Sequence, residues 1–165
     1  MKKLIFAILI FTTACAEGPE VGQTFYLFRH AEKVLTDDTE DPPLLPEGRE
    51  RAEKIAALLA DVKVDRYYST RYIRNTATIR PSAEKQGKKI KTYEWHDWEP
   101  MIKEITANQY NLKNVVICGH GDNLLPMIEA LGCEAPLDSL GGHEYDKYFV
   151  VTVRGGKCSV ETELY

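Results

Sequence analysis

Short apolar runs alternate with segments of helical periodicity along most of this chain, and this alternation limits its fold more than any other feature. The apolar runs predict strands at 24–29, 64–69, 90–93 and 115–118. The intervening segments predict helices at 47–61, 71–86, 100–110 and 123–131. Runs at 147–153 and 158–164 flank two glycines and predict a hairpin. The pattern favours an α/β fold, a three-layer sandwich with a mostly parallel central sheet, helices on both faces and an antiparallel edge strand.

The N-terminus differs from the rest of the chain and predicts a secretory signal. Lys2 and Lys3 precede an apolar run, 4–11, which is too short to span a bilayer as a stable anchor. The residues that follow resemble the end of a bacterial lipoprotein signal, which implies cleavage before Cys15 and a lipid anchor on that residue. Cleavage after Ala16 is the alternative and would release a soluble exported protein.

We therefore expect three parts: a signal peptide at 1–16, a short tether at 17–23 and one folded domain at 24–165. The domain is expected in the cell envelope or periplasm, with membrane contact only through the lipid anchor. The 165-residue chain has a formal net charge of −4, which argues against a general nucleic-acid binder. Its ordinary apolar and charged content excludes an intrinsically disordered chain.

Three cysteines follow the signal, at positions 118, 133 and 158. Because three is odd, at least one of them stays unpaired. An exported protein permits a disulfide between Cys133 and Cys158, but we favour three small buried side chains.

Polar side chains follow three of the predicted strands at the point where each ends. Arg29 and His30 follow the first strand. Arg74 lies one turn into the helix after the second strand, and His120 follows the fourth strand between two glycines. The carboxyl ends of parallel strands meet at one edge of a sheet, where open α/β sheets bind their ligands. We therefore expect these four side chains to form one site.

These residue types suit a phosphoryl group. Arginine offers a planar pair of donors and remains charged, and a neutral histidine can attack phosphorus and hold it as phosphohistidine. We expect no metal and no cofactor. A metal-dependent hydrolase is one alternative, but two nearby arginines would repel a metal ion. Its candidate ligands would be His30, Glu32, His120 and Asp122. A non-catalytic module that binds a phosphorylated ligand is the other alternative.

Several conspicuous residues are given ordinary structural roles. Trp95 and Trp98 are expected in the core or at a rim rather than as a platform for substrate. His96 and His143 are expected on the surface. The acidic loop at 36–46 is expected to be a solvated face.

Four ordered blocks of this sequence resemble the histidine phosphatase superfamily, which has the phosphoglycerate mutase-like fold. Residues 29–33 read Arg-His-Ala-Glu-Lys, the form of the first signature in one small subset. Residues 69–78 resemble the second block, and residues 119–122 with the following Pro126 resemble the third. A fourth likeness lies at 44–48, before the first long helix.

Three positions depart from the usual pattern of these blocks. Leu45 stands where threonine is usual, Gly121 where serine is usual and Asp122 where asparagine is usual. None of the three replaces a residue that the family uses to bind or attack phosphorus.

The resemblance implies that His30 is the nucleophile of a metal-independent phosphatase. The candidates for contacting the substrate are Arg29, Arg74, His120, Ser69 and Lys33. The proton donor stays open. Asp122 is the first candidate, Glu94 and Glu99 are the others, and the smallest members of the superfamily use no dedicated acid.

The natural substrate also stays open. The domain is barely larger than the core of the fold, so its site should be open. An open site suits an exposed phosphate on a protein, a sugar or an envelope glycolipid better than an enclosed metabolite, and it makes a mutase-like phosphotransferase less favoured. A small phosphorylated substrate stays open as the alternative. We expect a monomer or a weak dimer.

Overall fold

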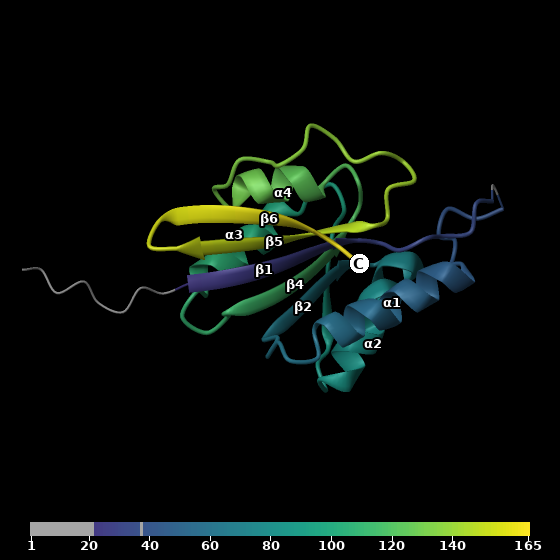
Figure 1. Ribbon diagram of the computed structural model, residues 1–165, viewed down its shortest axis with the longest axis horizontal. Helices are drawn as coiled ribbons and strands as arrows, with labels where there is room; N and C mark the ends of the chain where they lie inside the picture. Colours follow the sequence, from purple (N-terminus) through teal and green to yellow (C-terminus); the bar gives the residue numbers. More distant parts are fainter. Residues whose placement is uncertain (1–21, 37) are drawn as a thin grey trace, which may run out of the picture.

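The computed structural model describes residues 22–36 and 38–165, which build one six-stranded sheet (Figure 1). The strands are β1 (Gly22–Arg29), β2 (Arg66–Thr70), β3 (Ile90–Tyr93), β4 (Asn114–Gly119), β5 (Lys147–Arg154) and β6 (Lys157–Leu164). Their order across the sheet is β3-β2-β4-β1-β5-β6. The first four are parallel, and the predicted hairpin supplies two antiparallel strands, β5 and β6. The predicted α/β fold is confirmed.

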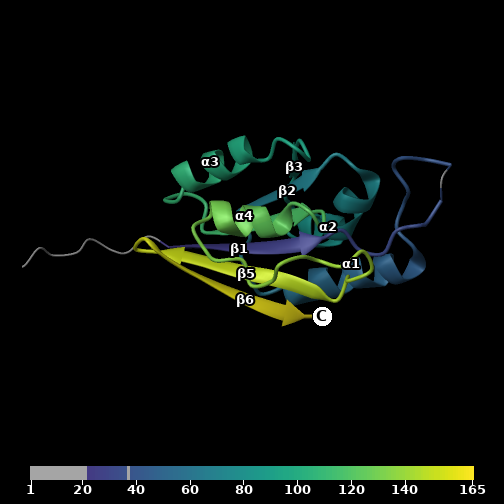
Figure 2. The ribbon, with the colours of Figure 1, turned by 90° about the horizontal axis from the view of Figure 1, so that it is seen from above.

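Helices within the described residues cover both faces of the sheet (Figures 1 and 2). They are α1 (Pro46–Leu58), α2 (Ile73–Lys85), α3 (Glu99–Ala107) and α4 (Leu124–Ala130). Because side chains alternate along a strand, β1 serves two cores. Phe25 and Leu27 pack with α3 and α4, whereas Phe28 packs with α1 and α2. The three layers therefore form as expected.

The first strand begins earlier than its apolar run suggests. Gly22 and Gln23, which the sequence places in the tether, pair with β5. The buried Gln23 amide donates to the backbone oxygens of Ile105 at 3.1 Å and Leu112 at 2.8 Å, so a polar residue is anchored inside the fold. The expected signal peptide, its Cys15 and tether residues 17–21 lie outside the described residues.

The second long helix begins later than predicted, because a side chain from the acidic loop defines its start. The Ile73 backbone N–H donates to the Asp41 carboxylate at 2.8 Å, so α2 starts at Ile73 rather than at position 71. A carboxylate at a helix N-terminus satisfies a free N–H and complements the helix dipole. The acidic loop is therefore not only a solvated face, since Asp41 packs against α2.

Cys133 and Cys158 form a disulfide with a Cα–Cα distance of 5.2 Å, which corrects the expectation of three unpaired cysteines. Both residues are only partly buried, so neither behaves as a small core residue. The bond ties the segment after α4 to β6. Cys118 is buried in β4 and has no disulfide partner among the described residues. No helix in the described ranges is long and apolar enough to cross a membrane.

Candidate active site

The carboxyl ends of β1, β2 and β4 lie side by side and open into one pocket. Arg29, the last residue of β1, pairs in register with Gly119, the last residue of β4. The pocket has a volume of about 470 Å³. It is lined by Arg29, His30, Lys33, Arg74, Trp95, His120, Gly121, Asp122, Ser139 and Leu140. The structure thus brings together the two histidines and two arginines that the sequence places at three strand ends.

His30 is held as a neutral base with one free ring nitrogen. Its Nδ1 lies 2.9 Å from the Ala31 carbonyl oxygen. Because a carbonyl oxygen can only accept, Nδ1 carries the proton and Nε2 keeps its lone pair. Burial is the main cause that lowers the pKa of His30 to about 4, and the positive charges of Arg74 and Arg29 add to this effect. His30 is therefore neutral and nucleophilic at pH 7.

His120 is fixed on several sides. Its Nε2 lies 3.0 Å from the Thr70 hydroxyl, and its backbone N–H donates to the Asn123 side chain at 2.8 Å. The Trp95 indole stacks on its ring at a centroid distance of 4.2 Å. Burial, followed by the charges of His30 and the two arginines, lowers the pKa of His120 to about 3. The ring centroids of the two histidines are 5.5 Å apart, which leaves both beside the same pocket.

Arg74 approaches the pocket from the first turn of α2. Its side chain is buried, its Cζ lies 4.4 Å from the centre of the Tyr72 ring, and one terminal nitrogen lies 3.6 Å from the Asp41 carboxylate. Its Nε is buried and has no hydrogen-bond partner within the part of the chain that the structure describes. A buried guanidinium N–H without a partner is costly, so this donor is suited to an anion in the pocket.

We expected the two terminal nitrogens of Arg29 to hold phosphate, but in the structure they have other partners. Its terminal nitrogens donate to the backbone oxygens of Gly141 at 2.6 Å, Gly142 at 2.9 Å and Glu144 at 3.1 Å. Its Cζ also lies 4.6 Å from the centre of the Tyr145 ring. Only Nε is buried and unpartnered among the described atoms of this side chain. Arg29 therefore holds segment 139–145 against the pocket and offers one donor to a ligand.

Two side chains of α2 explain the second sequence block. The Asn75 amide donates to the Gly119 backbone oxygen at 2.8 Å, which fixes the end of β4. The Thr78 hydroxyl accepts the Ala31 backbone N–H at 2.9 Å and donates to the Arg74 backbone oxygen at 2.7 Å. The helix that carries Arg74 is thereby tied to the backbone beside His30.

The remaining predicted residues fall into two groups. Lys33 and Asp122 line the pocket, and Asp122 accepts the Trp95 indole N–H at 3.0 Å. Ser69 does not line it, because its side chain is fully buried and donates to the Thr70 backbone oxygen at 2.8 Å. Glu94 lines a neighbouring cavity. Glu99 begins α3 and lines neither of these two cavities.

Three residues at the site are not predicted from the sequence. Trp95, expected in the core or at a rim, stacks on His120 and lines the pocket. Thr70 follows Ser69 on β2. Neighbouring side chains of a strand point to opposite faces, so this alternation is the signal that could have shown which of the two contacts the site. The Tyr145 ring lies 5.9 Å from that of His30, in a loop with no periodicity to mark it. His96 is exposed as expected, and it also stacks on Trp95 at 4.6 Å.

The pocket is built for an anion. Two buried Nε–H donors, from Arg29 and Arg74, have no partner in the described ranges, and Lys33 adds a positive charge. No group of three or more His, Cys, Asp or Glu side chains within the described residues is arranged to hold a metal ion. Fixed guanidinium donors around a neutral histidine form the arrangement that phosphoryl transfer needs.

Comparison with known protein families gives one match. The profile of the histidine phosphatase superfamily (branch 1) matches residues 25–100, a range that contains His30 and Arg74 and ends before His120. A search of curated proteins found no significant match to this sequence.

Solved structures of phosphatases share the fold. The protein histidine phosphatase SixA, solved with tungstate, has a TM-score of 0.70 at 14% identity, over 86% of this chain and 97% of that chain. A mycobacterial glucosyl-3-phosphoglycerate phosphatase has a TM-score of 0.66 at 13% identity, over 87% and 98% of the two chains. At these identities the likeness shows the fold. The profile match over residues 25–100 and the shared fold together show that the chain is similar to the histidine phosphatase superfamily, branch 1.

Proposed function

We propose that this chain is a metal-independent phosphatase that hydrolyses a phosphomonoester or a similar phosphoryl group through a phosphohistidine intermediate on His30. One observation carries the proposal: a buried, neutral His30 shares a pocket with the Nε–H donors of Arg29 and Arg74, which have no hydrogen-bond partner among the described residues. A structure of the mycobacterial glucosyl-3-phosphoglycerate phosphatase contains inorganic phosphate. That complex supports a phosphorylated substrate here.

In the first step, the lone pair on His30 Nε2 attacks phosphorus, and the bond from phosphorus to the leaving oxygen breaks. The electron pair of that bond departs with the leaving group. The Nδ1–H bond to the Ala31 oxygen stabilises the positive charge that develops on the imidazole. The guanidinium donors and His120 stabilise the charge on the phosphoryl oxygens.

In the second step, a water oxygen attacks phosphorus, the N–P bond breaks and the electron pair returns to Nε2. Inorganic phosphate then leaves, and the released water proton passes to solvent or to the group that protonated the leaving oxygen. Asp122 is our first candidate for that group because it lines the pocket. Glu94 is the second, since its cavity adjoins the pocket at Trp95.

The proposal is tested by phosphate release from 4-nitrophenyl phosphate, with and without a chelator. We expect turnover that resists the chelator and disappears in His30→Ala. The matched control is His143→Ala, because His143 is exposed and its side chain lines no part of the pocket. Radiolabelled substrate should leave acid-labile label on the wild-type protein and none on His30→Ala. Full activity in His30→Ala would overturn the mechanism, and phosphate binding without turnover would favour the non-catalytic module.

We also propose that residues 1–16 direct export and that Cys15 carries the lipid anchor. The test is palmitate labelling of the full chain in a bacterial host, with Cys15→Ala as the control. Label that persists in Cys15→Ala would contradict the anchor.

A further inference from the structure

The edge of the sheet opposite the pocket, where β1 to β4 begin, carries a basic surface. The register brings the strand starts together, since Thr24 pairs with Asn114 and Arg66 with Val115. The turn between β5 and β6 reaches the same edge, and Figures 1 and 2 both show it beside the start of β1. This basic edge is formed by exposed side chains at or next to these strand ends, namely Arg66, Lys88, Lys89, Lys113, Arg154 and Lys157.

The charge of the basic edge is not neutralised by its neighbours. None of its six cations forms an ion pair with an acidic side chain in the described ranges. The Asp65 carboxylate lies at this edge but accepts the backbone N–H groups of Lys113 at 2.7 Å and Asn114 at 3.0 Å. Asp61 and Lys63, both exposed after α1, balance each other in charge. The edge therefore keeps a net positive charge.

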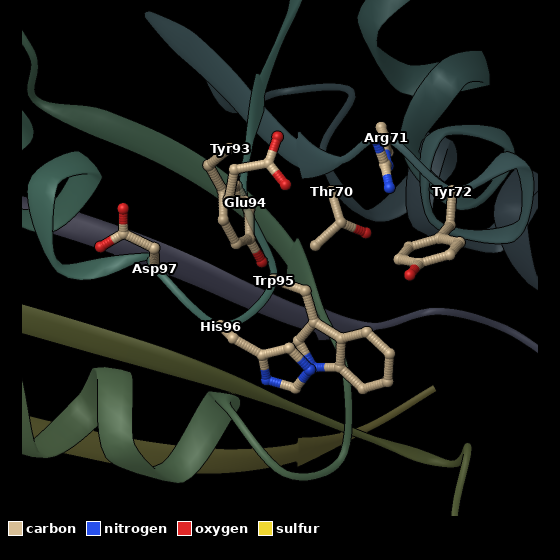
Figure 3. Close-up of a pocket in the computed structure, with 8 residues that line it drawn as sticks. All are labelled: Thr70, Arg71, Tyr72, Tyr93, Glu94, Trp95, His96 and Asp97. Atoms are coloured by element: carbon tan, nitrogen blue, oxygen red, sulfur yellow. The ribbon is translucent and has the colours of Figure 1, made fainter.

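The pocket end of the molecule has the opposite character. Figure 3 shows the carboxylates of Glu94 and Asp97 beyond the end of β3, and both residues are exposed. Further exposed carboxylates at this end are Asp38, Glu40, Asp122 and Glu144. The chain as a whole has a net charge of −4, so the basic edge reflects a separation of charge rather than an excess of cations. Such a separation gives the molecule a preferred orientation on a charged surface.

A cavity of about 370 Å³ lies on the β5–β6 hairpin at the basic edge. It is lined by Thr152, Arg154, Lys157, Cys158 and Ser159, a set with two cations, two hydroxyls and no carboxylate. These donors suit an anionic group such as the phosphate of a lipid headgroup.

An exposed aromatic residue lies at the same edge. Tyr110, in the turn before β4, is 71% exposed. Tyrosine is enriched at membrane interfaces because one end of its side chain is apolar and the other is polar. The basic edge thus combines cations with a side chain suited to the headgroup layer.

The chain that precedes the described residues also leaves from the basic edge, because β1 begins at Gly22. Cys15, where we propose the lipid anchor, precedes Gly22 by seven residues. Seven residues span at most about 25 Å when fully extended. A lipid on Cys15 would therefore hold the basic edge within about 25 Å of the membrane.

We propose that the basic edge binds the headgroups of an anionic lipid surface. This contact is independent of the proposed hydrolysis. A Lys or Arg near such a surface strengthens binding by about fivefold, and the attraction fades within a Debye length of ~8 Å at physiological salt. The pocket of His30 and His120 lies at the other end of β1, whose eight residues at ~3.3 Å each place it about 26 Å from the edge. In the bound orientation the pocket faces the aqueous phase.

The test measures lysine acetylation of the full chain after maturation in a bacterial host. The protein is placed in phosphatidylcholine vesicles, with and without phosphatidylglycerol, and treated with an uncharged acetylating reagent. Mass spectrometry gives the rate at each lysine. We expect the anionic vesicles to slow acetylation of Lys113 and Lys157 by about tenfold. Salt at about 1 M should restore the rate, since the Debye length falls to ~3 Å.

Lys54 and Lys103 are the internal controls for this measurement. Both are exposed, on α1 and α3, and neither belongs to the basic edge. Their acetylation should be the same in both kinds of vesicle.

Variants of arginine test the charge without changing the lysines that are read. We expect Arg66→Gln combined with Arg154→Gln to remove most of the protection, because two charges at about fivefold each amount to about 25-fold in binding. The matched control combines Arg80→Gln with Lys54→Gln. These two residues are exposed on α2 and α1, away from the basic edge, so protection should stay within about twofold of wild type.

Equal acetylation of Lys113 and Lys157 in both kinds of vesicle would overturn the proposal, and so would an equal slowing at Lys54 and Lys103. Slowing by a single-stranded RNA but not by anionic vesicles would overturn it in favour of a nucleic acid. If Cys15 carries no lipid, the protein is mixed with the same vesicles at higher concentration, and the same pattern is expected. A chain that hydrolyses no phosphate ester would leave every one of these outcomes unchanged.

Discussion

The Trp95 indole lies against the His120 imidazole, with ring centroids 4.2 Å apart and planes inclined by 20°. The indole is itself oriented, because its N–H donates to Asp122 at 3.0 Å. The Thr70 hydroxyl lies 3.0 Å from Nε2 of the same imidazole ring. The position of His120, which we propose binds the phosphoryl group, thus depends on Trp95, to which the proposed mechanism gives no chemical role.

Replacing Trp95 should test this dependence. We expect Trp95→Leu to lower kcat by about tenfold, since a stacked aromatic pair contributes ~0.5–1.5 kcal/mol beyond its burial. Trp95→Phe keeps a ring but loses the bond to Asp122, so its loss should be smaller. Solvent would reach His120 in Trp95→Leu and raise its pKa from about 3, because burial is the main cause of that low value. The measurement combines steady-state kinetics with NMR titration of His120.

Trp98 provides the control for that experiment. It packs against the core on the α3 side and does not line the pocket of His30 and His120. Trp98→Leu should therefore lower the thermal stability without changing kcat or the pKa of His120. An equal loss of kcat in Trp98→Leu and Trp95→Leu would mean that general loosening, rather than the stacking contact, accounts for the effect.

The two histidines should stay neutral well into the acid range. Their pKa values are lowered to about 4 for His30 and about 3 for His120, whereas an unfolded histidine titrates near ~6.5. Between these values the unfolded chain binds more protons than the folded one, so stability falls as the pH drops from about 6.5 toward 4. The stabilising effect of the neutral rings is complete above about pH 6.5.

NMR is the right measurement, because a phosphomonoester itself titrates near pH ~6 and would distort a rate profile. The ring Cε1–H signals of His30 and His120, assigned with His30→Ala and His120→Ala, should not move between pH 7 and pH 5. The same chain in urea should show histidine titration near ~6.5. Midpoints near 6.5 in the folded protein would contradict the buried, neutral pair.

The strands of the sheet could be predicted from the sequence because the spacing of apolar residues reflects which side chains are buried. In β1, Phe25 and Leu27 pack in one core and Phe28 packs in the other. A strand needs apolar residues on both faces only when both faces of the sheet are covered. Boundaries were less predictable, since tertiary contacts set them. Gln23 enters β1 because its amide finds two backbone oxygens distant in sequence, and α2 begins where Asp41 meets it.

The site was predictable where a side chain follows a strand, as with His30 and His120. It was not predictable where the contact comes from a loop that is distant in sequence. The oxygens that occupy the Arg29 fork belong to segment 139–145, more than a hundred residues away, and nothing in that segment marks the contact. Trp95 and Tyr145 likewise enter the site from irregular segments.

The disulfide that ties the segment after α4 to β6 should stabilise the fold. Cys133 and Cys158 are 25 residues apart, and closing a loop of that length contributes about 3 kcal/mol by chain entropy. We expect the double variant that combines Cys133→Ser with Cys158→Ser to lower the free energy of unfolding by about this amount. Urea denaturation measures it, and a thiol reductant should lower the wild type to the level of the variant. Unchanged stability in both would contradict a native disulfide.

The tie between α2 and the segment that follows β1 should matter for both stability and turnover. Thr78 accepts the Ala31 N–H and donates to the Arg74 backbone oxygen, so Thr78→Val keeps the shape and leaves a buried N–H unpaired. We expect a loss of about 1–3 kcal/mol in stability and a lower kcat, because the backbone beside His30 loses its anchor. Thr76→Val is the matched control, since the Thr76 hydroxyl bonds only to its own turn, at Tyr72 and Ile73. Differential scanning calorimetry and steady-state kinetics measure the two effects. If Thr76→Val lost as much activity as Thr78→Val, the anchor would not explain the loss, because the control leaves the hydrogen bond of the Ala31 N–H intact.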